Sequence, residues 1–232
     1  MAEAPIHPAK LEQLRRFSTC VLASAIETFD IRLRNVGFTD STVGCIFPDF
    51  PAVIGYAATA RIRSSDPPME GHSYYDRTDW WNHILTIPAP RIVVIEDLDK
   101  PPGLGAFVGE VHAAILQALS CTALVTNGAV RDVRQVHATG FQMFAGNASV
   151  SHAYAHVLDF GATVEVGHMK VQPGDLLHGD RHGVQTIPIK IAGKVLPVAR
   201  QIVKNREQIV GLCRSDHFSL DVLRQAVKDA AK

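Results

Sequence analysis

The chain has 232 residues, with 23 lysine and arginine residues balanced by 23 aspartate and glutamate residues, so its formal net charge is zero. This balance removes the main compositional argument for nucleic acid as a partner, which needs a surplus of cations on one face. Hydrophobic residues make up 47% of the chain and the mean hydropathy is +0.07, values typical of a globular protein rather than a disordered one.

Membrane insertion and export are not expected. No apolar run approaches the roughly 20 residues of a membrane span, and the N-terminal segment lacks the apolar stretch of a signal peptide. The cysteines are scattered and form no Cys-x-x-Cys pair, which favours a reducing, cytoplasmic location. They are Cys20, Cys45, Cys121 and Cys213.

The N-terminal half begins with helical periodicity and then alternates between strands and helices. Two short helices are predicted after Pro8, with Ser18 or Thr19 capping the second. A strand over 52–62, a loop over 64–72 and a helix over 79–86 follow. Next come a strand over 91–97, a glycine-rich loop, a helix over about 106–120, a strand over 122–127 and a helix starting near Asp132. This order predicts a parallel sheet with buried strands.

Shorter elements are predicted after Phe141. Strands over 142–145, 162–166, 175–177 and 184–187, separated by turn signals, indicate a meander that completes the sheet. The tail is helical by period over about 189–214 and 220–231. No linker or repeat is visible, so we expect one domain over 1–232, with a core over about 11–188 and a helical extension over about 189–232.

Two loops follow the buried strands, at the sheet edge where active sites of parallel sheets lie. The first, over 100–109, contains Gly103, Gly105 and Gly109 and leads into a helix, whose N-terminal N–H groups suit an anion. The second, over 127–132, places Arg131 beside Asp132. Such a pair can point a guanidinium at an anionic substrate and an oxygen ligand at Mg²⁺. A plain loop-to-helix junction and a structural ion pair are the alternatives for these two features.

Taken together, these residues resemble a known family. Glu110 is followed after twenty residues by Arg131-Asp132, with Gly128 just before and PGDLLHGDRHGVQTIP later in the chain. This pattern is similar to the RraA-like family, which includes class II pyruvate aldolases acting on 4-hydroxy-4-methyl-2-oxoglutarate, and oxaloacetate decarboxylases. The resemblance runs from about Leu11 to Pro188 and is strongest over 91–136.

The resemblance implies a role for each matching residue. The backbone around Gly105, Ala106 and Phe107 would hold the pyruvyl carboxylate, and Arg131 would bind the substrate's carboxylate and keto oxygen. Asp132 would ligate a divalent metal, Mg²⁺ or Mn²⁺, and Glu110 would contact the metal through water or orient the base. The reaction would be a lyase reaction that passes through pyruvate enolate, whose oxygen needs a Lewis acid and a cation beside it.

The resemblance also implies a fold and an assembly. The expected fold is α/β, an α/β/α swivelling-domain sandwich with a central mixed sheet and flanking N- and C-terminal helices. The expected assembly is a homotrimer or homohexamer with sites at subunit interfaces, completed by a carboxylate from a neighbouring C-terminal region, where Glu207 is the only glutamate.

The sequence departs from the family pattern at several positions. Asn127 and Ser24 stand where aspartate is frequent, and residues 73–81, SYYDRTDWW, are unusually aromatic. The substrate specificity can therefore differ from that of the best-known members. A metal-dependent lyase with a substrate outside the known set is a further alternative. One of Trp80 and Trp81 is expected in the core and the other at an interface.

Two rival interpretations concern function and metal binding. Some family members bind and inhibit a ribonuclease without catalysis; that branch lacks the aspartate after the arginine, so Asp132 favours an enzyme. His152 and His156 could share a helical face as zinc ligands, but the glutamate of the His-Glu-x-x-His motif is absent. Asp180 and His182 are interpreted as turn residues, with pocket lining as the alternative.

Overall fold

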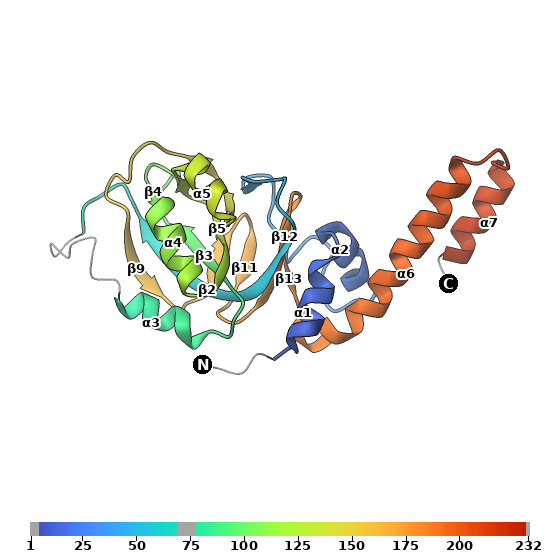
Figure 1. Cartoon of the computed structure of the whole chain (residues 1–232), viewed down its shortest axis with the longest axis horizontal. Coiled ribbons are helices and arrows are strands. Elements are labelled where there is room, and N and C mark those ends of the chain that lie inside the picture. Colours follow the sequence, from blue (N-terminus) through green and yellow to red (C-terminus); the bar gives the residue numbers. More distant parts are fainter. Residues whose placement is uncertain (1–4, 69–77, 231–232) are drawn as a thin grey trace.

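The computed structural model describes residues 5–68 and 78–230, and its centre is a strongly curved, nearly closed sheet (Figure 1). The main sheet has the strand order β1-β7-β5-β3-β2-β12-β13, and β9 also pairs with β2. Its strands are β1 (Gly44–Cys45), β2 (Val53–Arg63), β3 (Arg91–Asp97), β5 (Cys121–Thr126), β7 (Gln142–Ala145), β9 (His156–Phe160), β12 (Leu176–Asp180) and β13 (Gly183–Ile187).

Helices lie on the outside of the sheet and at both ends of the described chain (Figure 1). They are α1 (Pro8–Arg15), α2 (Thr19–Glu27), α3 (Thr78–Thr86), α4 (Glu110–Ala118), α5 (Val133–Thr139), α6 (Ile189–Cys213) and α7 (Leu220–Ala230). The fold is therefore mixed α/β with flanking terminal helices, as the resemblance implied. The predicted cap of α2 is confirmed, because the Ser18 hydroxyl accepts a hydrogen bond from the Val21 N–H at 3.3 Å.

The parallel centre of the sheet confirms the strand–helix alternation read from the sequence. Strands β2, β3, β5 and β7 are parallel neighbours. Strand β3 is buried at every position except the half-buried Glu96, as expected for a strand covered on both faces. The connection from β3 to β5 passes through α4, and the connection from β5 to β7 passes through α5.

The predicted helix over 106–120 starts later than its sequence pattern suggested. Residues Ala106–Val108 form β4, which pairs with β6 (Ala129–Val130), and β6 pairs with β8 (Asn147–Ala148) in a small parallel sheet. Helix α4 begins only at Glu110, after Gly109 as its N-cap. Pairing with segments distant in the sequence therefore overrides the helical periodicity of 106–108.

The C-terminal strands complete the main sheet only in part. The predicted strand over 162–166 is shorter, as β10 (Val164–Val166), and forms a separate hairpin with β11 (Met169–Val171). Strand β9 was not predicted from the sequence. Strands β12 and β13 join the main sheet beside β2 through antiparallel pairing, so this part of the meander is confirmed.

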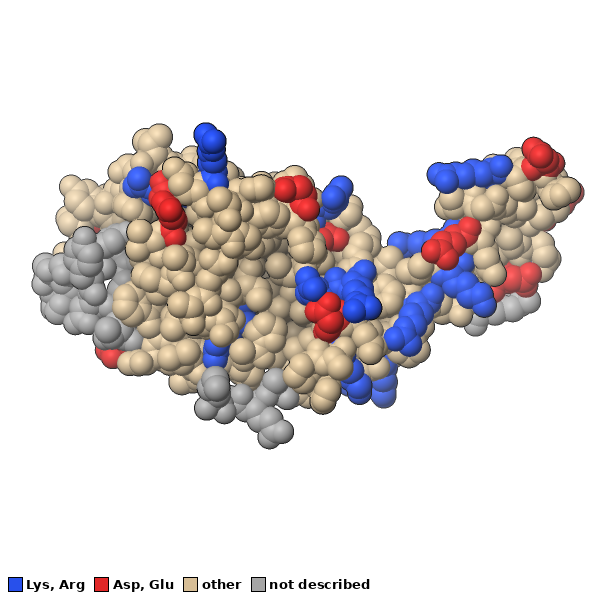
Figure 2. Space-filling model, viewed as in Figure 1, with Lys and Arg blue, Asp and Glu red and all other residues tan. Residues whose placement is uncertain are grey.

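The described C-terminal helices form a hairpin that projects from the sheet (Figure 1). Helix α6 packs against α2 with its first half, where Ile191, Val195 and Ala199 are buried. Helix α7 has no buried residue. Figure 2 shows lysine and arginine side chains gathered where α1 meets α6 and along α6.

The hydrophobic core lies on both faces of the curved sheet. Trp80 is buried at 2% exposure and Trp81 is half-buried, which confirms the expected core tryptophan. Arg91, also buried, donates from Nε to the Ile87 carbonyl at 2.7 Å and from Nη1 to the Leu119 carbonyl at 2.7 Å. Across the described ranges, no helix has the length and apolar character needed to cross a membrane.

Candidate active site at the N-terminus of helix α4

Glu110, Arg131 and Asp132 lie together in the structure. The Asp132 carboxylate accepts a hydrogen bond from the Glu110 backbone N–H at 3.2 Å and one from Arg131 Nε, also at 3.2 Å. Side chains of Arg131 and Asp132 are each 31% exposed, so both remain accessible to a small molecule. Residues 22 positions apart are thus joined at the first turn of α4, where the helix dipole favours negative charge.

Gly109 makes this close approach possible. A Cβ atom at this position would lie 2.8 Å from Arg131 Cγ and would overlap the Asp132 carboxylate. The backbone of Gly109 is extended, so glycine is required here by space and not by a left-handed conformation.

Asp132 has an unusual backbone conformation. Its φ of 54° and ψ of 36° place it in the left-handed region at the N-cap of α5, where aspartate is tolerated better than most residues. Its side chain makes no cap hydrogen bond to α5 and turns instead to α4.

The predicted carboxylate seat, Gly105 to Phe107, lies in and before β4. Its N–H groups at Gly105 and Ala106 already donate to Ser64 Oγ at 3.1 Å and to the Ser151 carbonyl at 2.9 Å. The side chains of Ala106 and Phe107 are buried, at no more than 1% exposure. These N–H groups therefore already have partners within the protein. The N–H group that contacts Asp132 is that of Glu110, in the first turn of α4.

Two buried aspartates at the end of β3 shape the glycine-rich loop. Asp97 accepts hydrogen bonds from the N–H groups of Asp99 at 3.0 Å and Gly103 at 2.7 Å. Burial raises the pKa of the Asp97 carboxyl, and these hydrogen bonds offset the rise in part. Asp97 was not among the residues predicted from the sequence, although its place at the end of a buried strand was the available signal.

Asp99 fixes the loop to the end of β2. It accepts hydrogen bonds from the N–H and hydroxyl groups of both Ser64 and Ser65, at 2.7 to 2.9 Å. Burial tends to raise the pKa of the Asp99 carboxyl, but these hydrogen bonds outweigh it and hold the pKa below its ordinary value. Because Ser64 Oγ also accepts from Gly105, this network connects β2 to the segment that leads to Glu110.

The departure at Asn127 has a structural explanation. Its side-chain oxygen accepts from the Asp97 N–H at 2.7 Å, and its amide nitrogen donates to the Asp97 carbonyl at 3.0 Å. A carboxylate could accept but not donate, so asparagine joins the ends of β3 and β5 more completely than aspartate would.

The remaining candidate residues lie elsewhere. His152 is in a loop and His156 is on β9, so they do not share a helical face. Asp180 and His182 form the turn between β12 and β13, where Asp180 accepts from the His182 N–H at 2.9 Å and from the Thr19 N–H at 3.0 Å. Glu207 is exposed on α6. Most of the aromatic segment 73–81 lies outside the described residues.

The donor set at Asp132 fits Mg²⁺ or Mn²⁺ bound mainly by water. Within residues 5–68 and 78–230, no group of three or more histidine, cysteine, aspartate or glutamate side chains is placed to hold a metal. Mg²⁺ commonly uses only one or two carboxylates and keeps several waters. The partly exposed Asp132 carboxylate supplies one such oxygen ligand, whereas a structural zinc site would need four ligands.

Fold and site together define a mixed α/β protein with an Arg-Asp pair at a helix N-terminus. The sequence model of the family described as RraA-like, Aldolase/RraA, matches residues 19–185. The chain therefore belongs to the RraA-like family.

Individual relatives are distant. A protein of Halalkalibacterium halodurans named "Putative 4-hydroxy-4-methyl-2-oxoglutarate aldolase" is 25% identical over 150 residues, which cover 64% of this chain and 66% of that protein. The match thus spans just under two thirds of the relative's length.

Solved structures share the fold at lower identity. An uncharacterized protein from Pseudomonas syringae pv. tomato is 19% identical with a TM-score of 0.75, over 99% of this chain and 97% of that chain. Streptomyces coelicolor RraAS2, described as an unusual member of the RNase ES inhibitor RraA family, is 17% identical with a TM-score of 0.68, over 87% and 96% of the two chains.

Proposed function

We propose that the protein is a divalent-metal-dependent carbon–carbon lyase that releases pyruvate. Its substrates would be of the 4-hydroxy-4-methyl-2-oxoglutarate type, cleaved as by a class II aldolase, or oxaloacetate, which would be decarboxylated. The observation that carries the proposal is the meeting of Glu110, Arg131 and Asp132 at the N-terminus of α4. The similarity to a relative named for aldolase activity supports it.

Both reactions break the bond between C3 and C4 of a 2-oxo acid. In the aldol substrate the C4 hydroxyl gives its proton to a base and C4 leaves as the carbonyl carbon of a second pyruvate, and in oxaloacetate C4 leaves as CO2. In both reactions the bonding electrons pass to the C2 oxygen as pyruvate enolate, and C3 then takes a proton. Arg131 would bind the substrate carboxylate and the C2 oxygen, because its guanidinium presents several donors in one plane. A cation already in place would stabilise the charge that develops on that oxygen.

The helix backbone would complete the anion site. The first turn of α4 lies at the positive end of the helix dipole, which favours an anion, and the Glu110 N–H there donates to a carboxylate oxygen of Asp132. We infer that this turn, more than the internally bonded segment over 105–107, would receive the pyruvyl carboxylate. The predicted contacts of Gly105, Ala106 and Phe107 remain to be tested by a pyruvate-bound crystal structure.

Asp132 would hold the divalent metal directly, and Glu110 would contact it through water or orient the base. A bound Mg²⁺ or Mn²⁺ would supply Lewis-acid stabilisation of the enolate oxygen. Arg131 Nε keeps one oxygen of Asp132 oriented at 3.2 Å, so the carboxylate is fixed before any ligand arrives.

The test is pyruvate formation from oxaloacetate and from 4-hydroxy-4-methyl-2-oxoglutarate, with Mg²⁺, Mn²⁺ or EDTA. Arg131→Gln should lower kcat/KM by about 10² to 10³-fold, the usual effect of losing one donor to a developing oxyanion. Asp132→Asn should lose metal-dependent activity and should weaken Mn²⁺ binding in calorimetry. The matched control is Asp221→Asn, because Asp221 pairs with Arg224 on exposed α7 at 3.0 Å, and it should behave like the wild type.

The outcomes separate the proposal from its rival. Absence of metal-dependent pyruvate release from both substrates would refute the lyase, and absence of Mn²⁺ binding as well would favour a non-catalytic regulator of a ribonuclease. Wild-type rates in Asp132→Asn would remove Asp132 from the site while leaving the lyase standing.

A further inference from the structure

A cavity of about 1050 Å³ lies at the end of the parallel strands opposite to Arg131 and Asp132. Strands β2, β5 and β7 begin in its wall, at Val53, Cys121 and Gln142, and Pro90 precedes β3 there. The carboxyl ends of these parallel strands lead toward Glu110 and Arg131. With a rise of about 3.3 Å per residue, the six residues of β5 separate the two regions by about 20 Å. The cavity is therefore distinct from the candidate active site.

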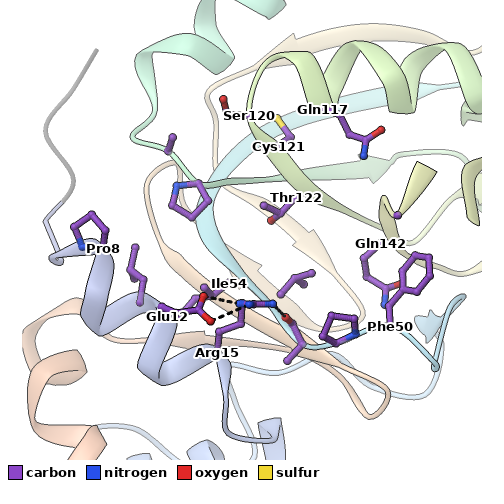
Figure 3. A pocket seen from close by; sticks show the side chains of 17 residues that line it. Pro8, Glu12, Arg15, Phe50, Ile54, Gln117, Ser120, Cys121, Thr122 and Gln142 are labelled. Atoms are coloured by element: carbon purple, nitrogen blue, oxygen red, sulfur yellow. Dashed lines mark hydrogen bonds and ion pairs between the residues drawn. The ribbon is translucent and has the colours of Figure 1, made fainter. Parts of the chain in front are cut away.

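The wall of this cavity is mainly apolar, with α1 on one side and the segment before β2 on another (Figure 3). Its polar side chains are largely engaged within the protein. Thr122 donates to the Arg91 carbonyl at 3.1 Å, Gln117 donates to the Thr139 carbonyl at 3.0 Å, and Gln142 donates to the Phe47 carbonyl at 2.9 Å. A ligand would thus meet apolar surface over most of its contact area.

The charges in the wall neutralise each other. Arg15 donates from Nε and Nη2 to the two oxygens of Glu12, at 2.8 and 2.9 Å, as the dashed lines of Figure 3 show. Burial raises the pKa of the Cys121 thiol to about 12, so this side chain stays uncharged. A carboxylate placed against the apolar wall would lose hydration, and the charge of Arg15 is already paired with Glu12, whereas an uncharged group would not carry this cost.

One donor remains available at the mouth. Arg15 Nη1 lies 3.4 Å from the Ala52 carbonyl, a long contact that leaves this nitrogen able to donate to another oxygen. Pockets of a few hundred to about 1000 Å³, apolar with a few convergent polar groups, are typical sites for small molecules.

We propose that this cavity is a second binding site, which takes an uncharged, mainly apolar small molecule whose carbonyl oxygen accepts a hydrogen bond from Arg15. Size, apolar lining, the neutralised ion pair and the remaining Nη1 donor all favour this class of ligand.

The test compares two probes of the same shape, 2-naphthamide and 2-naphthoate, by isothermal calorimetry on the whole chain. The amide should bind at one site per chain, and the carboxylate at least about tenfold more weakly, a difference of about 1.4 kcal/mol. Glu12→Gln leaves Arg15 without its carboxylate and should reverse the preference. Equal binding of both probes to the wild type, or no binding of the amide, would overturn the proposal.

A pocket-filling variant locates the binding. Ala52→Trp places an indole in the cavity and should weaken 2-naphthamide at least about tenfold. Its matched control is Ala114→Trp, on the exposed side of α4 and away from the cavity, which should bind like the wild type. Unchanged binding in Ala52→Trp, or equal loss in both variants, would contradict the assignment. If Ala52→Trp does not fold by circular dichroism, the reversal in Glu12→Gln decides the question.

Discussion

Gly109→Ala changes the candidate active site by a single methyl group. The added Cβ would stand 2.8 Å from Arg131 Cγ, and ordinary contact begins at 3.4 Å, so Arg131 would have to move by 3.4 − 2.8 = 0.6 Å. The Asp132 carboxylate, which lies closer still, would have to move further. Misplacement of catalytic groups by about 1 Å can cost about 10²-fold in rate, and we expect kcat/KM for pyruvate release to fall by about that factor.

The stability of this variant should change much less than its activity. Overpacking of this kind costs about 1 to 3 kcal/mol, so the chain should still fold. Gly211→Ala serves as control, because a Cβ there has no neighbour within 4 Å and the residue lies in α6. Steady-state kinetics with a coupled pyruvate assay, together with urea denaturation, separate the two effects. Wild-type kcat/KM in a folded Gly109→Ala protein would refute the arrangement of Arg131 and Asp132 described above.

Two further predictions concern stability and assembly. Burial lowers the pKa of His178 to about 4, and it outweighs the nearby Asp180 carboxylate and the backbone of Arg15 and Phe17, which act in the opposite direction. Between pH 6.5 and 4 the His178 imidazole binds a proton in the unfolded chain but stays neutral in the folded chain. The free energy of unfolding should therefore fall by about 3 kcal/mol as the pH drops over this range. His178→Leu should lack this component in urea denaturation at pH 7 and pH 4, and an identical pH dependence in both proteins would contradict it. The second prediction is a homotrimer or homohexamer, supported by exposed apolar side chains such as Val111, at 70%, and Val150, at 93%. Light scattering should give the mass of a trimer or a hexamer. The mass of a monomer would contradict the expectation that neighbouring subunits share the active site.

The central sheet was predictable because its strands carry their own signal. The continuous apolar run over residues 92–95 indicates a strand buried on both faces, and the alternation with helical periods implies parallel neighbours. Segments with weaker signals were misjudged. Residues 106–108 have helical periodicity but pair with β6, and β9 is too exposed and irregular for its alternation to be recognised.

The residues proposed for the candidate site could be chosen from the sequence, but the hydrogen bonds that hold the neighbouring loops in place could not. Glu110 and Arg131-Asp132 stood out through their types and spacing. The roles of Asp99 and Asn127 depend on hydrogen bonds to residues 35 and 30 positions away, which no local pattern contains.

The sequence by itself determined the family, the parallel sheet and the candidate site residues, because residue type, period and spacing are properties of the chain alone. Only the tertiary structure decided that Glu110 and Asp132 meet across Gly109 and that the N–H groups of Gly105 and Ala106 are already occupied. It also decided that the amino ends of β2, β5 and β7 lie in the wall of an apolar cavity. These features arise where distant segments are brought within a few ångströms, and contacts over that range are fixed by packing.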